Sequence, residues 1–179
     1  MSEDLWYEQL RSSYRPAAIR VVFVGESAPD PGSGTRRFFY APQLTYDNLF
    51  RGLMAALYDA GSDALNNRKP EWLERFCADG FWLLDVVDRP INKLSSSQRS
   101  RARRGAAAEA IDRIAAARPI VGVVVCHGPT FTDLLSSGAS DRLTFLQSEP
   151  IPFPLGNFRA EFIRRVRLAL KGSGIQVPA

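Results

Sequence analysis

The chain has 179 residues, of which 45% are hydrophobic and 23% charged, and its formal net charge is +4. This composition is typical of a compact domain with a hydrophobic core, and it excludes disordered and collagen-like chains. The single histidine and the two cysteines, Cys77 and Cys126, exclude a histidine-rich metal site, a disulfide framework and a four-cysteine iron–sulfur cluster. We expect one domain over residues 1–179, with two buried thiols and no metal or other cofactor.

The hydropathy pattern indicates where the protein resides. The longest unbroken apolar stretch, Ile120 to Cys126, is too short to cross a bilayer. The N-terminal residues Ser2, Glu3 and Asp4 are polar or acidic, whereas a secretory signal peptide begins with positive charge. We therefore expect a cytoplasmic monomer with no membrane partner.

Short apolar runs alternate with helical patterns along the chain. The expected strands are Ile19 to Gly25, Phe81 to Val87, Ile120 to Cys126 and the weaker run Leu143 to Ser148. The expected helices are Tyr46 to Gly61, Pro70 to just before Gly80, Gln98 to Ala117 and a short one around Phe131 to Leu135. This alternation predicts an α/β fold, a three-layer sandwich around a central, mainly parallel four-stranded sheet.

The C-terminal part of the pattern ends in one more helix. Three prolines interrupt Glu149 to Gly156, so no regular structure is expected there. Asn157 is expected to cap the last helix. The apolar face of that helix should carry Phe158, Phe162, Ile163, Val166 and Leu170.

In parallel sheets, ligands bind at the carboxyl ends of the strands. The loops at that edge are Glu26 to Leu44, Asp88 to Ser97, His127 to Pro129 and Glu149 to Gly156. The first loop is long, which favours a functional role over a simple connection.

The first loop reads GESAPDPGSGTRRFFYAP. It has neither GxGxxG nor a Walker lysine, which argues against nucleoside-triphosphate hydrolysis. Glu26 stands at the tip of the strand, followed by the aromatic residues Phe38, Phe39 and Tyr40. A carboxylate beside aromatic rings suits a pocket that stacks a flat ring and positions a water next to it. The alternative is that Glu26 caps a turn and the aromatic residues cover the sheet.

Four motifs occur in a characteristic order: GES-x-P after the first strand, VVDRPIN after the second, HGPT after the third, and PFPLGN before the last helix. On these motifs, over roughly residues 19 to 170, the chain resembles the uracil-DNA glycosylase superfamily. The resemblance implies a uracil-DNA glycosylase-like fold. It also implies that DNA, double- or single-stranded, presents a flipped, damaged or deaminated base whose N-glycosidic bond is hydrolysed.

The resemblance also implies roles for individual residues. Glu26 would be catalytic and would activate or orient water, while Ser27, Phe38 and Phe39 would bind the base. Asp85 matches a position at which the family usually has an asparagine that reads uracil. A carboxylate accepts hydrogen bonds but donates none when ionised, so Asp85 fits the amino group of a cytosine-like or adenine-like base better than uracil O4.

The family's histidine-proline-serine turn is replaced here by Phe153, Pro154, Leu155 and Gly156. The family histidine is therefore missing. His127, at the end of the third strand, is the candidate for a partial catalytic substitute, and its alternative role is capping or packing. In the same turn, Gly156 and Asn157 are expected to contact DNA.

Basic residues cluster near the expected site. Pro90 to Ala108 contains five basic residues and no acid. As phosphate contacts we expect Arg36, Arg37, Lys93, Arg101, Arg103 and Arg104. The alternative is an ordinary solvated helix face. The basic residues Arg164, Arg165 and Arg167 are expected on the exposed face of the last helix.

Three functions fit these observations. The first is a DNA glycosylase-like protein acting in base excision repair, and the second is a catalytically silent relative that binds nucleic acid or a free nucleobase. The third is a small-molecule enzyme on a flavodoxin-like α/β fold. The first requires Glu26, Phe39 and Asp85 to meet in one cavity.

Overall fold

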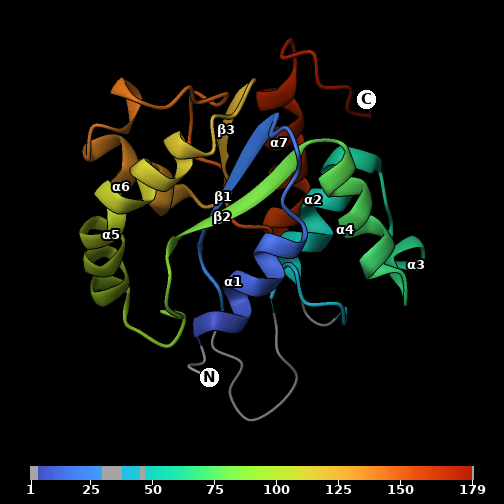
Figure 1. Ribbon diagram of the computed structural model, residues 1–179, viewed down its shortest axis with the longest axis horizontal. Coiled ribbons are helices and arrows are strands. Elements are labelled where there is room, and N and C mark those ends of the chain that lie inside the picture. The colour runs from blue at the N-terminus through green and yellow to red at the C-terminus, as the bar shows by residue number, and fades with distance from the viewer. Residues whose placement is uncertain (1–3, 30–37, 45–46, 179) are drawn as a thin grey trace.

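The computed structural model describes residues 4–29, 38–44 and 47–178. Its centre is a parallel sheet of β1 (Val21–Ser27), β2 (Phe81–Val87) and β3 (Gly122–Val125), in the order β2-β1-β3. Helices α5 (Ser96–Ala116) and α6 (Gly128–Ser136) lie on one side of the sheet (Figure 1). Helices α2 (Asn48–Tyr58), α4 (Lys69–Ala78) and α7 (Arg159–Leu170) lie on the other side. The predicted α/β class with a parallel sheet is therefore confirmed.

The three strands form where β-branched and other apolar residues run without interruption. Val21 to Val24 are fully buried, as expected for a central parallel strand that helices cover on both faces. In the parallel register, Val21 pairs with Phe81 on one side and with Gly122 on the other. The predicted first, second and third strands are confirmed, with ends that differ by at most two residues.

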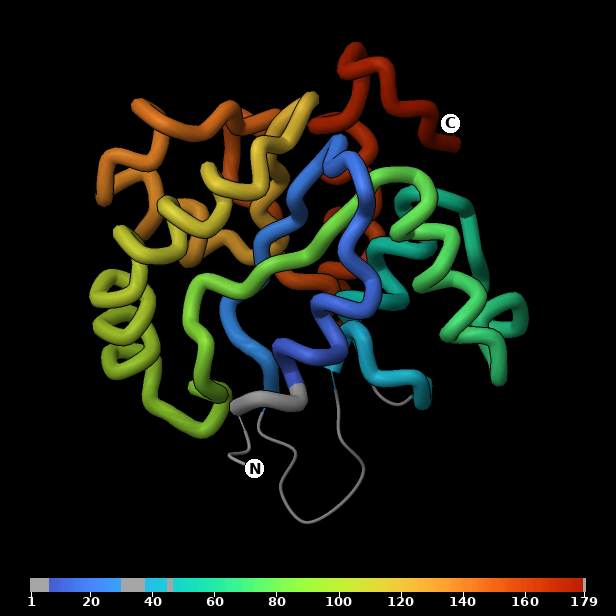
Figure 2. The backbone as a smooth tube through the Cα atoms, viewed as in Figure 1, coloured from blue at the N-terminus to red at the C-terminus, as the bar shows by residue number. Residues whose placement is uncertain are grey.

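Two helices were not predicted, α1 (Asp4–Ser13) and the single turn α3 (Ser62–Leu65). Among the described side chains of α1, the buried ones are Tyr7 and Arg11. The helix docks through Tyr7, Arg11 and the partly buried Leu10, which packs against the core. Figure 2 shows that this N-terminal helix lies near the carboxyl ends of β1 and β2.

The predicted fourth strand, Leu143 to Ser148, is not a strand in the described part of the chain. It makes one isolated parallel bridge, between Phe145 and Val123. Beyond this bridge the side-chain amide of Gln147 replaces the backbone: Oε1 accepts from Val125 N at 2.6 Å and Nε2 donates to Val125 O at 3.2 Å. The segment therefore cannot continue the ladder as backbone, and the prediction of four strands was wrong for this reason.

The other edge of the sheet also ends in a side chain. The hydroxyl of Tyr40 accepts a hydrogen bond from Leu83 N at 2.7 Å and lies 3.3 Å from Leu83 O, to which it donates. Tyr40 is completely buried, and burial raises the pKa of its hydroxyl, so the proton that it donates is retained. The aromatic segment that begins at Phe38 is thereby fixed to β2.

The last helix begins later than predicted. Gly156 has a φ of +55°, and residues Gly156–Phe158 form a 3₁₀ turn, η2, before α7 starts at Arg159. Asn157 therefore does not cap the helix, and Phe158 is exposed and does not belong to its apolar face. The predicted core positions Phe162, Val166 and Leu170 are buried. A second 3₁₀ turn, η1, covers Ala139–Asp141.

Arg167 also differs from the expectation of an exposed helix face. Its guanidinium donates to the carbonyl oxygens of Ala55 at 3.0 Å and Ala56 at 3.1 Å. These carbonyls belong to the last turn of α2, where a cation is favourable. Arg167 therefore fixes α7 to α2.

The sequence analysis also predicted two buried thiols and no segment that crosses a membrane. Cys126 is buried as expected, whereas Cys77 is half-buried, and both are free. Within residues 4–29, 38–44 and 47–178, no helix combines the length and the apolar character needed to span a membrane.

Candidate functional site

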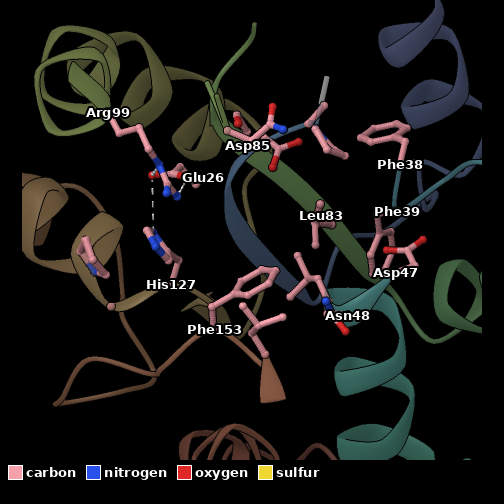
Figure 3. Close-up of a pocket in the computed structure, with 18 of the residues that line it drawn as sticks. Glu26, Phe38, Phe39, Asp47, Asn48, Leu83, Asp85, Arg99, His127 and Phe153 are labelled. Carbon is pink, nitrogen blue, oxygen red and sulfur yellow. Dashed lines mark hydrogen bonds and ion pairs between the residues drawn. The ribbon is translucent and has the colours of Figure 1, made fainter. Parts of the chain in front are cut away.

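A cavity of about 590 Å³ opens at the carboxyl ends of the three strands. Every residue predicted as catalytic or base-binding lines it: Glu26, Ser27, Phe38, Phe39, Asp85 and His127. Figure 3 shows Glu26, Arg99 and His127 on one side of the cavity, Phe38, Phe39 and Asp47 on the opposite side, and Asp85 between them. The structure thus brings together residues that are up to about a hundred positions apart in the sequence.

The topology explains this convergence. Glu26 is the second-last residue of β1, Asp85 lies near the end of β2, and His127 comes just after β3. Because all three strands are parallel, their carboxyl ends meet at one edge of the sheet. Gly25 pairs in register with Asp85, so Glu26 and Asp85 occupy neighbouring strands at the same level.

Glu26 is held by two arginines of α5. Arg99 donates from Nε to Oε1 at 3.2 Å and from a terminal nitrogen to Oε2. Arg103 donates to Oε1 at 2.5 Å, and its Nε donates to Asp133 at 2.7 Å. Burial works against ionisation of Glu26, but the hydrogen bonds from Arg99 and Arg103 outweigh it and hold its pKa below the ordinary value. Glu26 is therefore a carboxylate at neutral pH.

This arrangement limits what Glu26 can do chemically. Each carboxylate oxygen has room for about two hydrogen bonds. Oε1 accepts from both arginines, whereas Oε2 accepts from Arg99. Among the residues that the structure describes, none but Arg99 binds Oε2, which leaves one position there for a water molecule. The two guanidiniums make Glu26 a weak base, so it suits the orientation of water and the stabilisation of positive charge better than proton abstraction.

His127 forms the neighbouring wall. Its Nδ1 is joined to Thr130 Oγ1 by a hydrogen bond of 2.8 Å, and its ring meets Phe153 edge to face, with 6.3 Å between the ring centroids. Burial lowers the pKa of His127, so the ring is neutral at pH 7. His127 occupies the N-cap position of α6 but makes no side-chain capping bond to the helix backbone. Its ring lines the cavity instead.

Asp85 lines the cavity between these two sides, and its ion-pair partner comes from the unpredicted helix α1. Arg11 donates to Asp85 Oδ2 at 3.1 Å, and the two side chains are 8% and 5% exposed. Burial raises the pKa of Asp85, and the charge of Arg11 opposes that rise. Because arginine stays protonated, Asp85 has a permanent cationic partner.

Phe38 and Phe39 form a wall rather than an exposed platform, since they are 2% and 4% exposed. Phe39 packs against Tyr40, with 4.9 Å between ring centroids, and Phe38 against Tyr7, with 5.0 Å. The buried ammonium of Lys69 donates to Phe38 O at 2.9 Å and also pairs with Asp47. These aromatic residues both cover the sheet and line the cavity, so the two interpretations of the sequence are compatible.

Some lining residues were not assigned to the cavity from the sequence. Arg99 is the most important: the sequence placed it in the basic cluster of Pro90 to Ala108, whereas the structure shows it bound to Glu26. It precedes Arg103 by one helical turn, a spacing that puts both on one face of a helix, so a signal for the pair existed. Asn48 and Asn92 also line the cavity and were missed, and Phe153 and Phe158, which the sequence analysis named, had not been assigned to the cavity. Leu155 and Phe158, at 60% and 61% exposed, are apolar residues that also line this cavity and face solvent.

The predicted phosphate contacts have different surroundings. Lys93, Arg101 and Arg104 are exposed, and so are Gly156 and Asn157. Arg36 and Arg37 lie outside the described residues. Arg103 differs from the prediction: it is 6% exposed, and its guanidinium is shared between Glu26 and Asp133, so it is not presented to a phosphate.

Arg101 lines a separate groove along α5, together with Arg89 and Gln98. Neither Arg101 nor Arg104 reaches the main cavity. The basic surface and the cavity are therefore distinct features of α5, because successive residues of a helix point in different directions.

Among the side chains that the structure describes, no group of three or more His, Cys, Asp or Glu residues could hold a metal ion. No protein-family model matches the chain, and comparisons with curated proteins and with solved structures found no significant match.

Proposed function

We propose that the protein is a DNA glycosylase-like protein with a uracil-DNA glycosylase-like fold, which takes up an everted base and hydrolyses its N-glycosidic bond. The observation that carries the proposal is the convergence of Glu26, Phe39 and Asp85 on one cavity. Its volume of about 590 Å³ is in the range typical of small-molecule sites. An aromatic wall with a few convergent polar groups suits a flat heterocycle.

In the proposed reaction, Asp85 meets the edge of the base and the aromatic wall meets its face. Oε2 of Glu26 orients a water toward C1′ of the sugar, and the carboxylate stabilises the positive charge that develops there. The bond between C1′ and the base nitrogen breaks, the water oxygen bonds to C1′, and the proton of the water ends on the released base. Arg99, which is partly exposed, is close enough to Glu26 to keep it ionised throughout.

The experiment is a base-release assay with the purified chain on oligonucleotides that contain uracil, hypoxanthine or related lesions, single- and double-stranded. Glu26→Gln is expected to reduce release by about 100-fold or more, as the loss of one preorganised charge-stabilising group typically does. Glu109→Gln, on an exposed part of α5, is the matched control and should be neutral. Unchanged release in a folded Glu26→Gln variant would falsify the catalytic role of Glu26.

The pairing of Glu26 with two arginines also favours a second candidate, a silent relative that binds nucleic acid or a free nucleobase. Two guanidiniums lower the basicity of the carboxylate without preventing a base from entering the cavity. This candidate predicts salt-sensitive DNA binding without base release, which weakens when Arg101 and Arg104 are neutralised. A lack of DNA affinity even at low salt would favour a small-molecule enzyme instead.

A further inference from the structure

The two oxygens of Asp85 have different surroundings. Oδ2 accepts from Arg11 at 3.1 Å. Oδ1 makes no hydrogen bond to any residue within the described ranges 4–29, 38–44 and 47–178. Asp85 borders the cavity in Figure 3, and its side chain is only 5% exposed. An acceptor oxygen on a cavity-lining residue, to which no described residue donates, is a site at which a ligand that donates a hydrogen bond gains affinity.

The position of Oδ1 is set by the absence of a side chain on the neighbouring strand. Gly25 pairs with Asp85 in the parallel register. A Cβ atom added to Gly25 would lie 2.5 Å from Asp85 Oδ1. The carboxylate therefore extends over the backbone of β1, into space that any other residue would occupy.

Arg11 fixes the other side of the carboxylate. It is buried, it also pairs with Glu8 at 2.7 Å, and its guanidinium lies 5.6 Å from the centroid of the Phe38 ring. Arginine donates hydrogen bonds and accepts none, so Oδ2 of Asp85 is permanently occupied on the α1 side. Asp85 can therefore offer the cavity one oxygen, and that oxygen is an acceptor.

We propose that Arg11 is a positioning residue: it occupies Oδ2 of Asp85, so that only Oδ1 can accept a hydrogen bond from a base. The cavity then prefers bases with an amino group at the recognised edge over bases with a carbonyl there. The proposal deepens the proposed function and rests on it in one respect, that the cavity takes a base. An amino group donates directly to Oδ1. On a uracil-like edge, the N–H donor lies between two carbonyl oxygens, which the carboxylate repels.

The test uses two matched pairs of ligands, each methylated at the nitrogen that would carry the sugar: 1-methylcytosine with 1-methyluracil, and 9-methyladenine with 9-methylhypoxanthine. Their dissociation constants are measured by isothermal titration calorimetry. We expect the wild-type chain to bind at least one amino compound about tenfold or more tighter than its carbonyl partner, the difference that one hydrogen bond to a charged group provides.

Three variants isolate the roles. Asp85→Asn keeps an oxygen for Arg11 but turns the free position into an amide donor, and it should erase or invert the preference. Arg11→Gln should lose the preference, whereas Arg11→Lys, which retains a cation, should recover part of it. Arg15→Gln is the matched control, because Arg15 is exposed and packs over Trp82 away from the cavity.

The outcomes separate this proposal from the proposed function. Equal or tighter binding of the carbonyl compounds overturns it, as does an unchanged ratio in folded Asp85→Asn, or no binding of either class. Because these ligands have no glycosidic bond, amino selectivity without base release from DNA supports this inference and contradicts the glycosylase. Base release from DNA without amino selectivity has the opposite meaning.

Discussion

His127 and Glu26 are neighbours on one side of the cavity, with 3.9 Å between Nδ1 of the ring and Oε1 of the carboxylate. Burial lowers the pKa of His127, the guanidiniums of Arg103 and Arg99 lower it further, and Glu26 opposes them. Since the chain contains one histidine, the imidazole signals in an NMR spectrum belong to this residue alone. The histidine therefore reports the electrostatic balance of the site.

We expect His127 to titrate below its ordinary pKa of about 6.5, measured from the pH dependence of its ring proton signals. Glu26→Gln should lower this pKa further, and Arg99→Gln should raise it. On acidification, the unfolded chain binds the proton first, so the free energy of unfolding should fall as the pH drops from about 6.5 through the folded pKa. A pKa at or above 6.5 in the folded chain would contradict the assignment of a neutral ring.

Arg103 and Arg104 are neighbours on α5 with opposite environments, one buried and one exposed. Arg103→Met should destabilise the fold by about 1 to 3 kcal/mol, because it removes the cation shared by the half-buried Glu26, which keeps Arg99, and the half-buried Asp133. Arg104→Met should change stability by no more than about 0.5 kcal/mol. Urea denaturation followed by circular dichroism measures both. Similar midpoints for the two variants would show that the Arg103 ion pairs do not stabilise the fold.

Two glycines provide a matched pair of alanine substitutions. Gly25→Ala should destabilise by about 1 to 3 kcal/mol, since the new Cβ would lie 2.5 Å from Oδ1 of an Asp85 that Arg11 holds in place. Gly105→Ala, in the middle of α5, has no atom within 4 Å of the new Cβ and should stabilise by about 0.5 to 1 kcal/mol. Thermal unfolding measures both shifts. Equal gains in the two variants would mean that Asp85 moves aside freely.

Lys69 is one of three lysines in the chain, and it is 1% exposed, whereas Lys93 and Lys171 are exposed. Burial lowers the pKa of Lys69, which by itself would raise its reactivity toward acetic anhydride. The reagent cannot reach the ammonium, however, because Asp47 and Phe38 enclose it, and this protection determines the rate of acetylation. We expect mass spectrometry to show slow acetylation at Lys69 and fast acetylation at Lys171. Equal rates in the native chain, or protection that persists in denaturant, would contradict this.

The sequence was sufficient to predict the three strands of the sheet and the residues at their ends. Apolar runs such as Val21 to Val24 admit few structures other than a covered strand, and parallel strands bring their carboxyl ends together. That reasoning placed Glu26, Asp85 and His127 at one edge, and the cavity includes all three.

The partners of these side chains could not be predicted, because they depend on how helices lie over the sheet. Glu26 meets Arg99 and Arg103 only because α5 returns along β2 with that face turned inward. Arg11 reaches Asp85 from α1, a helix that was not predicted. Likewise, a single amide, that of Gln147, ends the ladder that the residue pattern of Leu143 to Ser148 suggests.

The side chains that end the sheet also protect the protein from other copies of itself. An open strand edge offers free N–H and C=O groups to which a strand of another molecule can add, and such addition is a route to aggregation. Here the Tyr40 hydroxyl occupies both groups of Leu83, and the Gln147 amide occupies both groups of Val125. A strand of another molecule would have to displace a buried side chain at either edge before it could pair. We therefore expect this short sheet to resist fibril-like growth.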